Sequence, residues 1–139
     1  YNMVTSRYAM KIKDAEPHLK KGHILSELGR DKDAIDVLGM ILRNPAWKGL
    51  NHAEAHLELG MAYRRQGQLA EAHGFFERLI VAYGGYTEIV SWAYYYDLLT
   101  LKEMGENESV QQLLEEYRTR IAILKKTEAY PLINETFTL

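Results

Sequence analysis

The length, composition and charge of the chain indicate one compact domain and exclude several classes of function. The chain has 139 residues, 47% of them hydrophobic, with 17 Lys and Arg against 19 Asp and Glu. This near balance of charge argues against the broad basic surface that nucleic-acid binding needs. The lack of cysteine excludes disulfides and thiolate chemistry. The longest apolar run, 89–101, contains Asp97 and is too short to span a bilayer.

Apolar side chains recur at steps of three and four residues along most of the chain, which is the spacing of one face of an α-helix. No stretch alternates with a period of two for long enough to predict a sheet. The pattern predicts an all-α fold with helices near 15–28, 31–43, 51–66, 69–83, 87–104 and 108–126.

Polar residues near the expected helix starts predict how those helices are capped. Asn51 and Glu54 have the spacing of a capping box, in which each side chain meets a free backbone donor. Asp31 and Asn107 each follow a glycine by two residues and are predicted N-caps.

The two ends of the chain differ from its helical centre. Residues 1–14 are expected to form a lead-in or partial helix, 15–126 the repeat domain, and 127–139 a C-terminal tail in which Pro131 interrupts any helix. The tail is apolar for a chain end. It either docks on the last helix pair as a cap or marks where a longer chain continues.

Three glycines divide the helical region at a fixed interval of 38 residues, and a small aliphatic residue follows each glycine by five positions. The glycines are Gly29, Gly67 and Gly105, and the aliphatic residues are Ala34, Ala72 and Val110. A fixed period in this range indicates stacked copies of one supersecondary unit.

The middle copy resembles the tetratricopeptide repeat (TPR) family. The residues that carry this resemblance are His56, Leu59, Gly60, Tyr63, Gly67, Ala72 and Phe76. The first copy matches it more loosely, and the third has Leu98 and Val110 in place of two small residues. The resemblance covers residues 15–122 and implies a right-handed array of three antiparallel helix pairs that binds other proteins without catalysis.

The period departs from that of the family, which is usually 34 residues. Four extra residues make about one helical turn, close to 6 Å of helix. They fall between one pair and the next, around 47–50 and 86–89. We therefore expect a curvature different from the standard array.

The resemblance implies that the first helix of each pair lines the inner face, where a partner binds. The partner-binding residues expected there are Leu19, His23, Leu57, Met61, Arg64, Trp92, Tyr95 and Leu99. Exposed Trp, Tyr, Met and Arg are enriched at binding hot spots. The alternative is that Trp92 and the tyrosines of 94–96 form core between neighbouring pairs or pack under the tail.

One known binding mode of the family does not fit this face. Some TPR domains grip an acidic C-terminal peptide with lysine, asparagine and arginine at set positions. The matching positions here are Leu19, His23, Glu58, Trp92 and Tyr96, none of which supplies the required charge or amide.

Candidate catalytic and metal sites are weak in this sequence, and we expect no cofactor. His52 and His56 have the spacing of a helical zinc site, but Glu54 is misplaced for the protease motif, and we expect structural histidines.

These observations predict a non-catalytic adaptor or scaffold module that binds a peptide or helix through an apolar and aromatic inner face. One alternative is a homo-oligomerisation module, with a homodimer completing the core, and another is a regulatory or sensor segment of a larger protein. We expect no membrane insertion and a soluble chain, with the cytoplasm slightly favoured.

Overall fold

The computed structural model of the chain describes residues 15–138, so the predicted lead-in over 1–14 lies outside the described residues. The described part is helical and carries no strand. The elements are α2 (Ala15–Glu27), α3 (Asp31–Leu42), the short 3₁₀ helix η1 (Pro45–Trp47), α4 (Leu50–Arg65), α5 (Leu69–Ala82), α6 (Thr87–Glu103), α7 (Asn107–Thr119), α8 (Ile121–Leu124) and α9 (Tyr130–Phe137). The first five predicted helices are confirmed to within one or two residues at each end.

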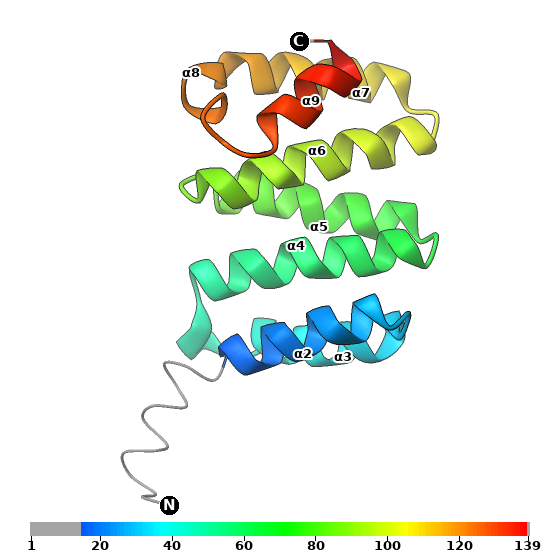
Figure 1. Cartoon of the computed structure of the whole chain (residues 1–139), viewed down its shortest axis with the longest axis vertical. Helices are drawn as coiled ribbons and strands as arrows, with labels where there is room; N and C mark the ends of the chain where they lie inside the picture. Colours follow the sequence, from blue (N-terminus) through cyan, green and yellow to red (C-terminus); the bar gives the residue numbers. More distant parts are fainter. Residues whose placement is uncertain (1–14, 139) are drawn as a thin grey trace, which may run out of the picture.

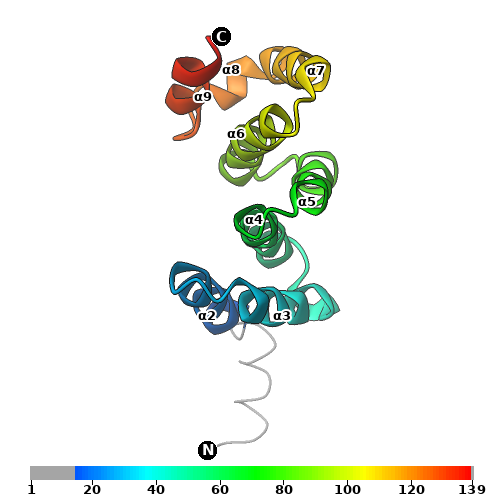
Figure 2. The same cartoon turned by 90° about the vertical axis from the view of Figure 1, so that its right-hand side faces the viewer.

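The helices form three antiparallel pairs, α2–α3, α4–α5 and α6–α7, stacked along the long axis of the molecule (Figure 1). Seen from the side, α2, α4 and α6 form one layer and α3, α5 and α7 the other (Figure 2). The first layer bows inward at α4 and α6, and α9 continues it beyond α6. The fold is therefore an all-α, TPR-like solenoid, as predicted, and α2, α4 and α6 line its inner face.

Each pair is closed by the same glycine turn. At the end of α4, the N–H of Gly67 donates to the carbonyl oxygen of Arg64 at 3.0 Å, and the N–H of Gln68 donates to that of Tyr63 at 2.9 Å. Gly67 has a φ of 79°, a left-handed conformation that costs glycine little. Gly29 and Gly105 close α2 and α6 with the same two bonds and a φ of 78°.

This turn explains why the predicted caps are wrong. Asp31 and Asn107 are the first residues of α3 and α7, and the N-caps are Arg30 and Glu106, which make no side-chain cap bond. The residue after each turn glycine already serves as N-cap, since its carbonyl accepts the first helical bond. The capping box at Asn51 is also absent, because α4 begins one residue earlier and Gly49 is its N-cap.

Close approach within the first two pairs depends on a helical glycine. A Cβ added to Gly60 would overlap Cε1 of Phe76, and one added to Gly22 would lie 2.7 Å from Leu38. In the third pair the corresponding positions are Leu98 and Leu114, both buried, and α6 and α7 pack less closely. The wider spacing in the third pair follows from exchanging a glycine for a leucine.

The predicted single helix over 108–126 is wrong. Helix α7 ends at Thr119, and Arg120 leaves helical geometry with φ −109° and ψ 11°. The guanidinium of Arg120 donates from Nη2 to the carbonyl oxygen of Gly84 at 3.0 Å, which holds the bend in place. Helix α8 then turns Leu124 into the core, where it is fully buried.

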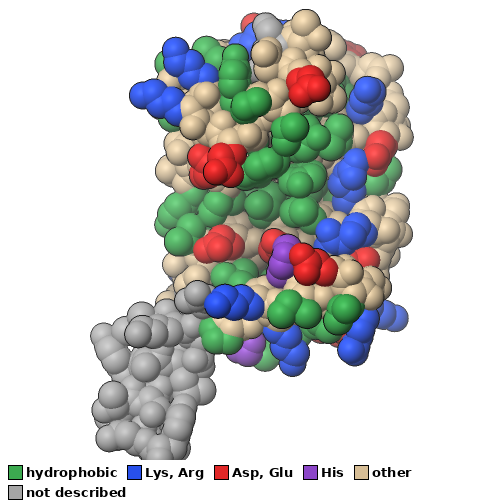
Figure 3. All heavy atoms as spheres, viewed as in Figure 1, with side chains coloured by type: hydrophobic (Ala, Val, Ile, Leu, Met, Phe, Trp, Pro, Cys, Tyr) green, Lys and Arg blue, Asp and Glu red, His purple; other side chains and the backbone are tan. Residues whose placement is uncertain are grey.

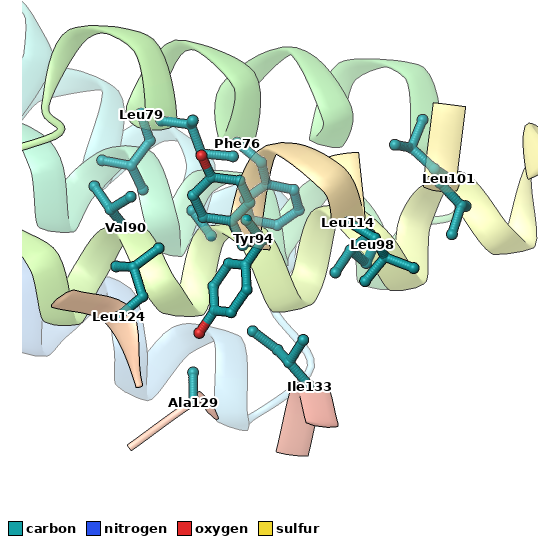
Figure 4. Packing of buried hydrophobic residues seen from close by; sticks show 14 of the residues in the cluster. Phe76, Leu79, Val90, Tyr94, Leu98, Leu101, Leu114, Leu124, Ala129 and Ile133 are labelled. Carbon is teal, nitrogen blue, oxygen red and sulfur yellow. The ribbon is translucent and has the colours of Figure 1, made fainter. Parts of the chain in front are cut away.

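The expectation that Pro131 interrupts any helix in the tail is also wrong. Pro131 lies in the first turn of α9, where its missing N–H has no helical partner to lose. Ala129 and Ile133 are fully buried against the core (Figure 4), so this segment docks on α6 rather than projecting from it. Beneath it, the Ser91 hydroxyl oxygen lies 2.9 Å from that of Tyr117 and 2.6 Å from that of Thr127.

The contact between Gly60 and Phe76 predicts opposite outcomes for two glycine substitutions. Gly60→Ala should destabilise the fold by about 1–3 kcal/mol, because the methyl group overlaps a buried ring. Gly74→Ala in α5 is the matched control, since its Cβ meets only the far end of Arg78 at 3.8 Å, and it should stabilise by up to about 1 kcal/mol. Urea unfolding measures both. Equal stability of the two variants would show that Phe76 does not hold the pair together.

Docking of α9 predicts a contrast between two adjacent residues. Ile133→Ala should cost about 2–4 kcal/mol in the free energy of unfolding, because it leaves a cavity between α6 and α9. Leu132→Ala should cost under about 1 kcal/mol, since Leu132 is 38% exposed. Thermal unfolding of the full chain measures both changes in stability. Similar losses of stability in the two variants would contradict the docking of α9.

Candidate functional site

A groove of about 850 Å³ opens on the inner face, across the middle of α2, the Leu50–Glu58 part of α4 and the start of α6. We call it the inner groove. Its lining residues are Leu19, Lys20, His23, Ile24, Leu50, Glu54, Leu57, Glu58, Gly85, Tyr86, Thr87, Glu88 and Ile89. Several of its apolar side chains face solvent: Ile24 is 54% exposed, Leu50 49% and Tyr86 36%.

The segments that join one helix pair to the next shape one end of this groove. After α3, the Asn44 side chain accepts a hydrogen bond from the N–H of Ala46 at 3.0 Å, which fixes η1. The chain then passes through Gly49, which has a φ of 89° and no side chain to clash with Tyr86. A Cβ added there would lie 2.8 Å from the Tyr86 hydroxyl oxygen. The two joining segments therefore meet at the groove.

Three of the predicted partner-binding residues line the inner groove, namely Leu19, His23 and Leu57. The other five lie on the same layer outside it: Met61, Arg64, Trp92, Tyr95 and Leu99. Each of these five is half-buried. Figure 3 shows hydrophobic side chains gathered across the middle of this face, over α4 and α6.

The aromatic residues outside the groove form one packed cluster. The rings of Trp92, Tyr95 and Tyr96 lie 5.2–6.0 Å apart and pack against the buried core. Arg64 is also engaged, since its Nη2 donates to Glu103 at 2.6 Å and its Nε to the Thr100 hydroxyl at 3.3 Å. These side chains support the fold of α6 as well as facing the inner surface.

The sequence prediction missed the groove residues in and next to the joining segments. Leu50, Tyr86 and Ile89 line the groove and fall where the 38-residue period places its extra residues. The lengthened period was therefore the signal that could have located them.

The groove carries more negative than positive charge. Among its lining residues are three carboxylates, Glu54, Glu58 and Glu88, and one ammonium group, Lys20. His23 lies between carboxylates, with Nε2 2.9 Å from Glu27 and Nδ1 3.5 Å from Glu58. Such an arrangement disfavours anionic partners.

Residues 53–85 match the family model of the tetratricopeptide repeat. This segment comprises nearly all of α4, the whole of α5 and the turn after it, which is the copy whose residues carry the resemblance. The chain is a TPR-like helical repeat. Neither the curated proteins nor the solved structures contain a match to it.

TPR units are in general non-catalytic modules for protein–protein interaction. Within the described part of this TPR-like chain, no helix is long and apolar enough to cross a membrane.

The paired histidines of α4 have structural roles in this TPR-like unit. His52 Nε2 lies 3.0 Å from the carbonyl oxygen of Asn44, and His56 Nδ1 lies 2.7 Å from that of His52. Burial lowers the pKa of His56, so its ring is neutral at physiological pH. Over residues 15–138, no three His, Asp or Glu side chains converge as metal ligands would.

A second polar cluster joins α5 to α6 on the side away from the inner groove. His73 Nδ1 lies 2.7 Å from Oδ1 of Asp97, which is 1% exposed, and His73 Nε2 lies 3.3 Å from Glu77. The hydrogen bond with Asp97 raises the pKa of His73 above 6.5, outweighing the effect of burial. Burial raises the pKa of Asp97, and the His73 bond offsets part of that rise. His73, Asp97 and Ser109 line one cavity. They do not form a catalytic triad, because both nitrogens of His73 already face carboxylates and neither faces the Ser109 hydroxyl.

The His73–Asp97 pair predicts a loss of stability with rising pH. Because the pKa of His73 is raised in the folded state, its contribution is present below pH 6.5 and is lost as pH rises through the folded pKa. The melting temperature should therefore fall by a few degrees between about pH 5.5 and about pH 8.5. His73→Gln should flatten this fall, whereas His23→Gln should retain it. An unchanged pH profile in His73→Gln would contradict the role of the pair.

Proposed function

We propose that this TPR-like chain is an adaptor or scaffold module that binds an apolar segment of another protein, a peptide or a helix, in its inner groove. The observation that carries the proposal is the groove itself, which crosses three successive first helices. Three of its apolar side chains, Ile24, Leu50 and Tyr86, are at least one third exposed. Exposed apolar side chains gathered in one concavity are typical of a protein-binding surface.

The groove supplies the chemistry that such binding needs. Leu19, Leu57 and Ile89 are half-buried, so they form a floor on which a partner's apolar anchors can exclude water. Two anchors at about 1.5–3 kcal/mol each, less the costs of association, give micromolar affinity. The remaining predicted residues, Met61, Arg64, Trp92, Tyr95 and Leu99, are proposed to extend the contact along the same layer.

Self-association is the alternative proposal, and the structure gives it less support. It was suggested by the apolar tail, whose Ala129 and Ile133 are buried against the chain's own core. Light scattering coupled to gel filtration over a hundredfold concentration range would detect a dimer.

Two isoleucines of nearly equal exposure allow a matched test of the groove. Ile24 is 54% exposed within the groove, and Ile123 is 57% exposed in α8, outside it. The probe is a fluorescein-labelled amphipathic peptide with a leucine stripe and an uncharged glutamine face, followed by fluorescence anisotropy. Ile24→Asp should weaken its binding at least about tenfold, because a buried charge opposes the apolar contact.

Ile123→Asp should bind the same peptide as the wild type does. Both variants should keep the wild-type melting temperature, since exposed substitutions change stability little. Equal affinity of the two variants, or no binding of any leucine-stripe peptide, would overturn the proposed function.

A further inference from the structure

We infer that the inner groove selects segments whose apolar anchors are flanked by lysine or arginine, and this inference rests on the proposed function. The groove would hold a cationic amphipathic helix or extended peptide of another protein. The charges that line the groove and the ion pairs of two arginines on α4 favour a cationic segment, and the width of the groove sets the length of that segment.

The acidic residues of the groove lie on two of its helices. Glu54 and Glu58 are in α4, one turn apart, and Glu88 is in the first turn of α6. Glu88 is held in place because its Oε1 accepts a hydrogen bond from the N–H of Glu128 at 2.7 Å. Beside an apolar floor, Glu58 and Glu88 attract cations more strongly than they would in open water.

Two arginines in the last turn of α4 form ion pairs outside the groove. Arg64 pairs with Glu103 at 2.6 Å, and Arg65 pairs with Asp31 at 3.0 Å. Of the cations on this layer, Lys20 alone is among the residues that line the groove within the described chain. An acidic segment would therefore meet like charge, whereas a basic segment would meet complementary charge.

The span of the groove sets the length of the segment. The groove crosses from α2 over α4 to α6. Its width is therefore two interaxial distances of about 8–10 Å each. About six residues of extended chain cover such a distance, at about 3.3 Å per residue. A helix covers it with about twelve residues, or three turns, at about 1.5 Å per residue.

The experiment uses three labelled peptides that share one leucine stripe and carry lysine, glutamine or glutamate on the polar face. The lysine peptide should bind the full chain about tenfold more tightly than the glutamine peptide, and the glutamate peptide should bind most weakly. The difference should shrink in about 0.5 M sodium chloride, because salt screens exposed charges.

A pair of double variants assigns the effect to the groove. Glu58→Gln with Glu88→Gln should remove most of the preference for lysine, and the amide oxygen introduced by Glu88→Gln can still accept the bond from the N–H of Glu128. Glu71→Gln with Glu108→Gln is the control, because it changes the net charge equally at exposed positions in α5 and α7. This control should keep the full preference.

Three results would overturn the inference. Equal binding of the three peptides, with Ile24→Asp still abolishing it, would reject the charge selection and leave the proposed function standing. A peptide affinity that falls as the protein dimerises would make a second copy the occupant. The first fourteen residues contain Arg7, Lys11 and Lys13. Tighter peptide binding after these are changed to glutamate in the full chain would make that segment the occupant.

Discussion

The three-residue turn between the two helices of each pair is the constraint on which the rest of this array depends. Gly29, Gly67 and Gly105 adopt the same left-handed conformation and make the same pair of backbone hydrogen bonds. So short a turn forces the helices to be antiparallel and adjacent, which then demands a small residue wherever two backbones come close. Gly60 against Phe76 meets that demand. The stacking of the pairs, and hence the inner face, follows from repeating this geometry.

The segments between pairs are not constrained in the same way, and they shape one end of the candidate site. The connection from α3 to α4 contains η1 and a left-handed glycine, and the connection from α5 to α6 brings Tyr86 over that glycine. Turns within pairs are uniform, while these connections differ from one another in length and shape. The uniform turns therefore build the scaffold, and the variable connections supply the groove with its own residues.

The fold was predictable because its information is local and repeated. Helical spacing and the interval between the turn glycines located the first five helices and their pairing. The helix caps could not be predicted from Asp31 or Asn51. The glycine turn before α3 makes Arg30 the N-cap, and the early start of α4 makes Gly49 the N-cap. Tertiary contacts determine the structure of the C-terminal region. The hydrogen bond from Arg120 to the carbonyl oxygen of Gly84 holds the bend after α7. Burial of Ile133 stabilises a helix where Pro131 suggested a break.

The candidate site was predictable only in part, for the same reason. Leu19, His23 and Leu57 were identified because a periodic helix face contains them. Leu50 and Ile89 lie in the first turns of α4 and α6, in step with Leu57 and Trp92, whereas Tyr86 belongs to the connection and only folding brings it to the groove. The aromatic residues of α6 had two expected roles: their half-buried rings pack against the core, and their contact with a partner stays a prediction.

The burial of Ile133 has a consequence for the order in which the chain folds during synthesis. One core cluster draws on α2, α3 and α4, and its buried residues run from Leu25 to Leu59, with Tyr63 and Phe75 packed against them. The other draws on residues from Ala53 to Ile133, so the third pair lacks part of its core until α9 has left the ribosome. The amino-terminal pair can thus be ordered while the carboxy-terminal pair still exposes apolar surface. Translation therefore imposes a direction of folding on an array built from three copies of one unit.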